Sequence, residues 1–126
     1  MLHQAARRNA TAVREGRVDL RLGSVEGLPA FEVPFDKILA VNTVMFWSHP
    51  DKSLEELRHL LRSRGRIAVA HQPRGPGVTD ATAMARGAEM AARLTRAGFS
   101  DVRLETLALK PAVVCAIGSN PSAGHR

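Results

Sequence analysis

His71 is the residue of this chain best suited to acid–base chemistry. It closes the apolar run that begins at Ile67, and an imidazole exchanges protons near neutral pH. The alternative for His71 is a structural role, as a histidine satisfied by its neighbours. His49 is the second candidate for a catalytic base. Gln72 and Arg74 come within three positions after His71, and we expect both to contact a substrate.

Several other kinds of site find no support in the sequence. The five histidines show no metal-ligand spacing with Cys115 or with the carboxylates, so we expect no metal site. No nucleophile–base pair of the hydrolase kind is visible. Aromatic residues make up 4% of the chain and Tyr is absent, which leaves few platforms for stacking on single-stranded nucleic acid.

The candidate residues are positioned by apolar segments that read as strands. The runs Ile38–Val41 and Arg66–His71 predict strands covered on both faces of a parallel sheet. Alternation over Arg17–Leu22 predicts a half-buried strand. Val102–Thr106 and Ala112–Ile117 predict an antiparallel closing pair. The fold class is therefore α/β, with a mostly parallel sheet and an antiparallel final strand.

Three helices are predicted between and before these strands. The first spans Met1–Arg14 and has no N-cap before it. The second carries Ser53 and Glu56 at the spacing of a capping box, in which each side chain bonds the other residue's backbone. Thr79 or Asp80 can cap the third, longest helix. Because helices alternate with strands, the pattern favours a sheet with helical crossovers.

The carboxyl ends of the predicted strands mark the candidate site. In open α/β sheets, ligands bind beyond these ends. The rule selects three segments, which are Gly23-Ser24-Val25, Val41-Asn42-Thr43 and His71-Gln72-Pro73-Arg74. Phe46 and Trp47 follow the second segment closely. They either close over a substrate or pack beneath the helix that follows.

Four motifs, covering nearly the whole chain, match a known pattern in order and spacing. With the family's own pattern in parentheses, they are Gly23–Pro29 ("G-D-A-x-x-L-P"), Phe35–Asn42 (the fourth-strand motif), Leu60–Ile67 ("L-R-P-G-G") and Leu94–Val102 ("L-x-x-A-G-F-x-x-V"). In this respect the chain resembles the class I S-adenosylmethionine-dependent methyltransferases, small-molecule type 11-like. The resemblance implies the C-terminal part of a Rossmann-like methyltransferase fold.

The resemblance also assigns roles to the segments at the strand ends. Gly23, Ser24 and Val25 would contact the adenine of S-adenosylmethionine. The segment Val41-Asn42-Thr43 would run beside the methionine part of this cofactor. Phe46 and Trp47 would lie over the methyl group or stack on the acceptor, a small molecule. The implied function is methyl transfer from S-adenosylmethionine.

Two departures from the family pattern shape the expectations. The glycine-rich loop after the family's first strand, and the acidic residue after its second, would both lie before Met1. Ser24 stands where the family commonly has an acidic residue that holds the adenine amino group. We therefore expect a truncated domain over residues 1–118, a frayed tail over 119–126, and weak or absent activity of the chain alone.

The missing strands would leave two open edges in the sheet, on either side of the gap. Open strand edges pair with other chains, so a homodimer through these edges is expected. A single cysteine, Cys115, and the lack of a signal peptide or a membrane-spanning apolar run predict a cytoplasmic protein.

Three functions stay open on the sequence. The first is methyl transfer to a small molecule. The second is a catalytically inactive interaction domain that oligomerises through open sheet edges. The third is a nonspecific nucleic-acid-binding module, suggested by the net charge of +6. Because the arginines are spread along the chain, a solvated basic surface is favoured over a nucleic-acid patch.

Overall fold

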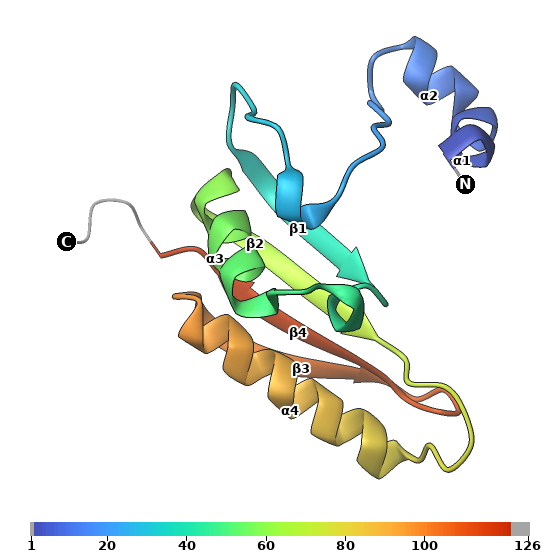
Figure 1. The fold of residues 1–126 in the computed structure, drawn as a ribbon, viewed down its shortest axis with the longest axis vertical. Helices are drawn as coiled ribbons and strands as arrows, with labels where there is room; N and C mark the ends of the chain where they lie inside the picture. The colour runs from blue at the N-terminus through green and yellow to red at the C-terminus, as the bar shows by residue number, and fades with distance from the viewer. Residues whose placement is uncertain (1, 122–126) are drawn as a thin grey trace.

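A four-stranded sheet with two helices on one face forms the centre of the molecule (Figure 1). The computed structural model describes residues 2–121. In chain order the helices and strands are α1 (Leu2–Arg8), α2 (Ala10–Arg14), β1 (Phe35–Val41), α3 (Pro50–Leu60), β2 (Leu61–His71), α4 (Asp80–Arg96), β3 (Ser100–Leu107) and β4 (Val113–Ser119). Two short 3-10 turns, Val25–Gly27 and Val44–Phe46, complete the set. Within the described part of the chain, no helix is long and apolar enough to cross a membrane.

The strands lie in the order β1-β2-β4-β3. β1 and β2 are parallel, whereas β4 runs antiparallel to both of its neighbours. β1, β2 and β3 therefore point the same way, and of the strands in residues 2–121 only β4 is reversed. The predicted α/β class, with a mostly parallel sheet and an antiparallel final strand, is confirmed.

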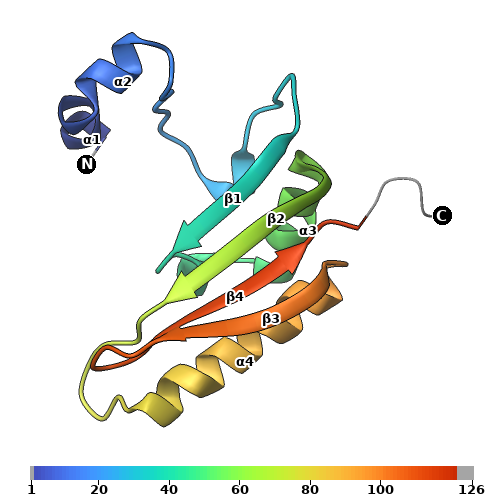
Figure 2. The ribbon, with the colours of Figure 1, turned by 180° about the vertical axis from the view of Figure 1, so that it is seen from behind.

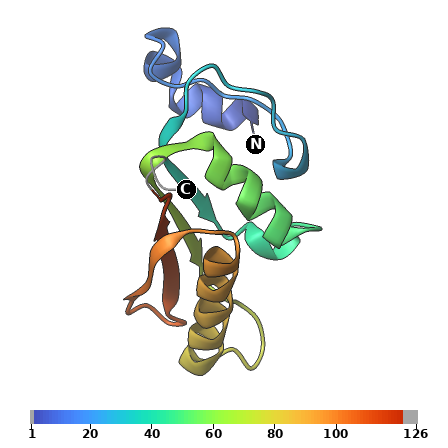
Figure 3. The same ribbon diagram turned by 90° about the vertical axis from the view of Figure 1, so that its left-hand side faces the viewer.

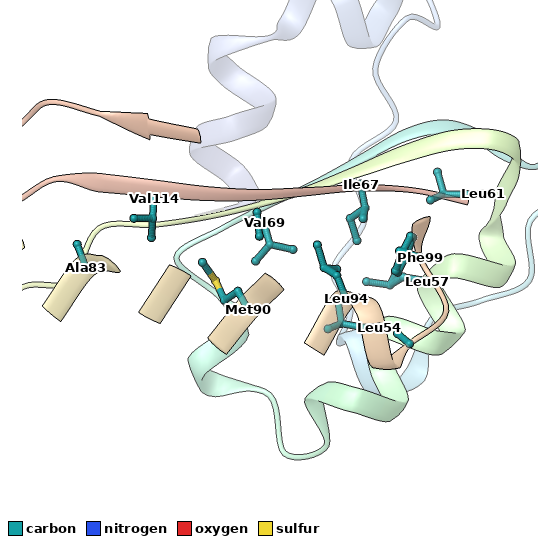
Figure 4. Packing of buried hydrophobic residues seen from close by; sticks show 12 residues of the cluster. Leu54, Leu57, Leu61, Ile67, Val69, Ala83, Met90, Leu94, Phe99 and Val114 are labelled. Carbon is teal, nitrogen blue, oxygen red and sulfur yellow. The ribbon is translucent and has the colours of Figure 1, made fainter. Parts of the chain in front are cut away.

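The hydrophobic core lies between the sheet and the helices α3 and α4 (Figure 4). β2 alternates, so that Ile67 and Val69 point toward the helices and are fully buried. Leu54 from α3 and Leu94 from α4 meet them there. Burying such side chains contributes about 1.5–3 kcal/mol each, so this one layer holds both helices against the sheet.

The opposite face of the sheet is open (Figure 2). Leu39 is 68% exposed and Val41 is 50% exposed on β1. The expectation that Ile38–Val41 is covered on both faces is therefore wrong for the described residues. α1 and α2, which contain no buried residue, lie away from this face (Figures 1 and 3).

The segment Arg17–Leu22 is irregular and forms no strand. Its alternating pattern lacks a hydrogen-bonding partner among residues 2–121, and a ladder needs one. Its charged residues pair locally instead, as Arg21 does with Asp19. Of the two open edges predicted for the gap, only that of β1 exists in the described chain. The first predicted helix is also divided, at Asn9.

The starts of the two sheet-facing helices differ in kind. α3 begins at Pro50, with His49 as a cap that makes no side-chain hydrogen bond. The capping box predicted at Ser53 is wrong, because Ser53 lies inside the helix and is buried. Of the two caps predicted for α4, Thr79 or Asp80, the structure has Thr79. The Thr79 hydroxyl accepts from the Thr82 N–H, and the Thr82 hydroxyl accepts from the Thr79 N–H.

Residues 119 and 120 belong to the folded part of the chain. Ser119 is the last residue of β4. The Asn120 backbone N–H donates to the Gly65 carbonyl at 2.7 Å, and its carbonyl accepts from the Arg64 N–H at 2.9 Å. The predicted tail boundary is thus wrong for these two residues, and positions 122–126 lie outside the described residues.

Candidate active site

Asn42 joins the carboxyl ends of β1 and β2. Its backbone N–H donates to the Ala70 carbonyl at 2.8 Å, and its side-chain oxygen accepts from the Gln72 N–H at 2.9 Å. The residue has a φ of 54°, a left-handed conformation that asparagine tolerates better than most residues. The chain therefore turns sharply off β1 while the two strand ends stay in register.

Gln72 continues this network toward the next loop. Its side-chain nitrogen donates to the Pro111 carbonyl at 2.8 Å, and its side-chain oxygen accepts from Arg74 at 3.1 Å. Both predicted substrate-binding residues of this segment are consequently held at the carboxyl end of β2. Pro111 belongs to the loop between β3 and β4, so three loops meet there.

His71 is the last residue of β2 and its side chain is buried, with 7% exposed. Neither ring nitrogen has a hydrogen-bond partner among the described residues. Burial lowers the pKa of the imidazole, and the positive charge of Arg86 lowers it further. The ring is therefore a neutral base near pH 7, and one of its nitrogens is free to accept a proton.

Two adjoining pockets share His71. The Trp47 pocket, of about 290 Å³, is lined by Met45, Trp47, His71, Arg86, Glu89 and Arg93 among others. The Arg74 pocket, of about 340 Å³, is lined by Asn42, Met45, Phe46, His71, Gln72, Arg74 and Arg86 among others. Six of the residues predicted from the sequence line these pockets: Asn42, Phe46, Trp47, His71, Gln72 and Arg74.

The two aromatic residues after β1 behave differently. Trp47 is partly buried, packs against the hydrophobic core and lines the Trp47 pocket. Phe46 is 81% exposed and borders the Arg74 pocket. The sequence left two roles open for both residues. The structure gives Trp47 a packing role, whereas Phe46 is left available to a ligand.

Three charged lining residues on α4 were not found by the sequence reasoning. Arg86, Glu89 and Arg93 lie three and four positions apart, which places them on one face of a helix. Arg93 donates to Asp51 at 2.8 Å, and this hydrogen bond is the main cause of the lowered pKa of the Asp51 carboxyl. Their i, i+3, i+7 spacing in the sequence could have predicted that these three side chains lie on one face of the helix.

The segment Gly23-Ser24-Val25 lies apart from both pocket linings. It was predicted at the carboxyl end of a strand, and that placement is wrong because no strand precedes it among the described residues 2–22. The Ser24 hydroxyl accepts from the Glu26 N–H and caps the 3-10 turn. Glu26 in turn accepts from the Ser48 N–H at 2.8 Å, a bond that lowers the pKa of its carboxyl.

The Glu26–Ser48 hydrogen bond nevertheless links this segment to the loop after β1. That loop carries Phe46 and Trp47, which line the two pockets. Val41 and Thr43 flank Asn42 at the same strand end but are not among the lining residues. The loops before and after β1 are thus connected, and the second of them reaches the pockets.

A family model described as a methyltransferase domain matches residues 1–69 of this chain, which is more than half of its length. This chain belongs to the class I S-adenosylmethionine-dependent methyltransferases. A relative in Bacillus subtilis (strain 168), the uncharacterised methyltransferase YdaC, is 31% identical over 123 residues. That match covers 97% of this chain and 66% of the relative, so this methyltransferase chain spans about two thirds of YdaC.

Solved structures with the same fold include enzymes of different activity. The S-adenosylmethionine-dependent methyltransferase SibL superposes with a TM-score of 0.73 and 20% identity, over 95% of this chain and 40% of SibL. The [4+2]-cyclase SpnF gives the same TM-score with 14% identity, over 97% of this chain and 63% of SpnF. At these identities the likeness establishes the Rossmann-like methyltransferase fold alone.

Proposed function

We propose that this chain takes part in methyl transfer from S-adenosylmethionine to a small-molecule acceptor. The observation that carries the proposal is His71, a buried imidazole at the carboxyl end of β2 that borders two pockets and has no hydrogen-bond partner among the described residues. A methyltransferase acting on a weak nucleophile uses such a base to take the nucleophile's proton.

The proposed cofactor-binding residues lie along the loops before and after β1. Val41, Asn42 and Thr43 would run beside the methionine part of S-adenosylmethionine, and Gly23, Ser24 and Val25 beside its adenine. Asn42 suits this role because its left-handed backbone exposes the strand end. Ser24 suits it less well, since its hydroxyl already caps a turn.

S-adenosylmethionine, when bound, supplies a methyl group that its sulfonium has already activated. What this chain adds is position and a proton acceptor. Gln72 and Arg74 would hold the acceptor, and Phe46 would cover it, with Trp47 forming the floor beneath. His71 would accept the proton that the acceptor gives up. Because SpnF has the same fold and is a cyclase, the fold does not identify the reaction, and methyl transfer has to be measured directly.

Two further parts of the proposal concern the molecule as a whole. A homodimer would form through the free edge of β1, where Leu39 and Val41 are exposed. A cytoplasmic location would suit Cys115, the single cysteine, whose thiol pKa is raised by burial and by Glu105. A thiol in that state is a poor nucleophile.

Calorimetric titration of the purified chain with S-adenosylhomocysteine tests the proposal, with the mass in solution measured alongside. We expect saturable binding. Asn42→Ala should weaken it about fivefold, the effect of losing roughly one hydrogen bond. Asn42→Asp keeps an acceptor for the Gln72 N–H and is the matched control. Absence of binding by a well-folded sample would overturn the proposed role of the cofactor.

A further inference from the structure

The Arg74 pocket is positively charged. Two arginines, Arg74 and Arg86, line it, and no acidic residue is among its lining residues. Arg74 donates to Gln72, which is neutral, and Arg86 forms no salt bridge within residues 2–121. Neither arginine therefore forms an ion pair within residues 2–121, although arginine favours bidentate pairing with an anion.

The neighbouring Trp47 pocket differs in this respect. Glu89 contributes a carboxylate there, and Arg93 already pairs with Asp51 at 2.8 Å. The unpaired positive charge of the site is consequently concentrated on the side of the Arg74 pocket. Arg86 borders both pockets, and its charge acts on His71 between them.

The rest of the Arg74 pocket is apolar. Met45, Phe46, Pro73 and Val78 contribute to its lining. Phe46 is 81% exposed and Met45 is 44% exposed, so both side chains present apolar surface that a ligand could cover. A pocket with a few charged groups and an apolar wall selects ligands with one charged end and an apolar body.

We propose that the acceptor of this methyltransferase is a small anion with an apolar body, whose carboxylate or phosphate binds Arg86 and Arg74. The body lies against Phe46 and Met45, and this arrangement brings the acceptor beside His71. The proposal rests on the proposed function, because it names the substrate class of that same site.

The test compares ligands that share a shape and differ in charge. Calorimetric titrations use 4-hydroxybenzoate, 4-hydroxybenzyl alcohol, phenyl phosphate and inorganic phosphate, each with the whole chain. We expect 4-hydroxybenzoate to bind about tenfold or more tightly than the neutral alcohol, because a charge-assisted pair is lost in the alcohol. If phenyl phosphate binds more tightly than 4-hydroxybenzoate, the preferred anion is a phosphate; otherwise it is a carboxylate. We expect inorganic phosphate to bind more weakly than phenyl phosphate, because it lacks the apolar body.

Two variants of equal charge change locate the binding. Arg86→Gln should weaken 4-hydroxybenzoate about tenfold or more, whereas Arg14→Gln, on the exposed helix α2, should leave it unchanged. Equal losses in both variants would show that net charge alone attracts the anion, and equal binding of the neutral alcohol would refute the anion site. Either result overturns the proposal.

The same titrations with and without S-adenosylhomocysteine separate the two proposals. Binding of S-adenosylhomocysteine without any binding of the anions would refute the acceptor class and leave the methyltransferase function standing. Binding of the anions without S-adenosylhomocysteine would leave the anion site and refute the cofactor role of this chain.

Discussion

A buried imidazole without a hydrogen-bond partner lowers the stability of the folded protein. Leaving a buried polar group without a hydrogen bond costs about 1–3 kcal/mol, and His71 leaves both ring nitrogens in that state. The charged residues that line the two pockets with it are Arg74, Arg86 and Arg93, together with Glu89. His71 lies between two pockets, so a bound ligand can supply the missing hydrogen-bond partner.

His71 should make the stability of the chain depend on pH. In the folded protein its pKa lies below the ordinary value of 6.5. As the pH falls below about 6.5, the unfolded chain binds a proton that the folded chain refuses, so stability falls. Urea unfolding at pH 7.5 and 5.5 should show this decline.

The variant His71→Phe removes the titration and the unpaired nitrogens. We expect its free energy of unfolding at pH 7.5 to be higher than that of the wild type by up to about 1 kcal/mol. At pH 5.5 this site should cause no loss of stability in the variant. His59→Phe, on the exposed side of α3, is the matched control and keeps the decline. An unchanged pH profile in His71→Phe would contradict the assignment.

At the scale of the element, α4 connects the fold to the site. Its apolar face, including Ala83 and Leu94, is buried in the core, and its other side carries Arg86 to the pockets. Gly98, just after the end of α4, has a φ of 99°. A Cβ at that position would meet the Arg58 Nε at 2.8 Å, a contact that a shift of this long side chain would relieve. The positive φ itself is what favours glycine at this end of the helix.

The first turn of α4 depends on the reciprocal capping by Thr79 and Thr82. Thr79→Ala leaves the Thr82 backbone N–H without its side-chain acceptor, and we expect it to lower the free energy of unfolding by about 1 kcal/mol. Thr79→Ser retains the hydroxyl and should stay close to the wild type. Chemical denaturation of the three proteins provides the measurement, and equal losses in the two variants would contradict a capping role.

At the scale of the whole molecule, the sheet has one covered and one open face. Two helices cover the first face, while the second is open (Figure 2). Leu39 and Val41, on the edge strand β1, are exposed. A long edge strand with exposed apolar residues is prone to pair with another chain. The described molecule thus combines a formed core with a surface suited to association.

Sedimentation of the chain at increasing concentration should show association. Leu39→Lys places a charge on the exposed side of β1 and should keep the protein monomeric at concentrations where the wild type dimerises. Leu109→Lys introduces the same charge at another exposed leucine, which lies between β3 and β4, and should leave the association unchanged. A wild type that is monomeric throughout would refute the proposed dimer.

The sequence alone determined the elements that carry local signals. Apolar runs specified β1 and β2, and the pair Thr79 and Asp80 marked the start of α4 without deciding which residue caps it, because side-chain periodicity and capping act over a few residues. The rule that ligands bind at the carboxyl ends of strands then selected Asn42, His71, Gln72 and Arg74, and all four line the Arg74 pocket.

The tertiary structure alone decided which patterns find partners. Arg17–Leu22 alternates like a strand, but no strand lies beside it among residues 2–121, and pairing depends on distant segments. Arg86 joins His71 only because α4 folds back along the sheet. Whether His71 is satisfied or free follows from the packing around it, since hydrogen-bond partners are set by contacts that sequence spacing does not encode.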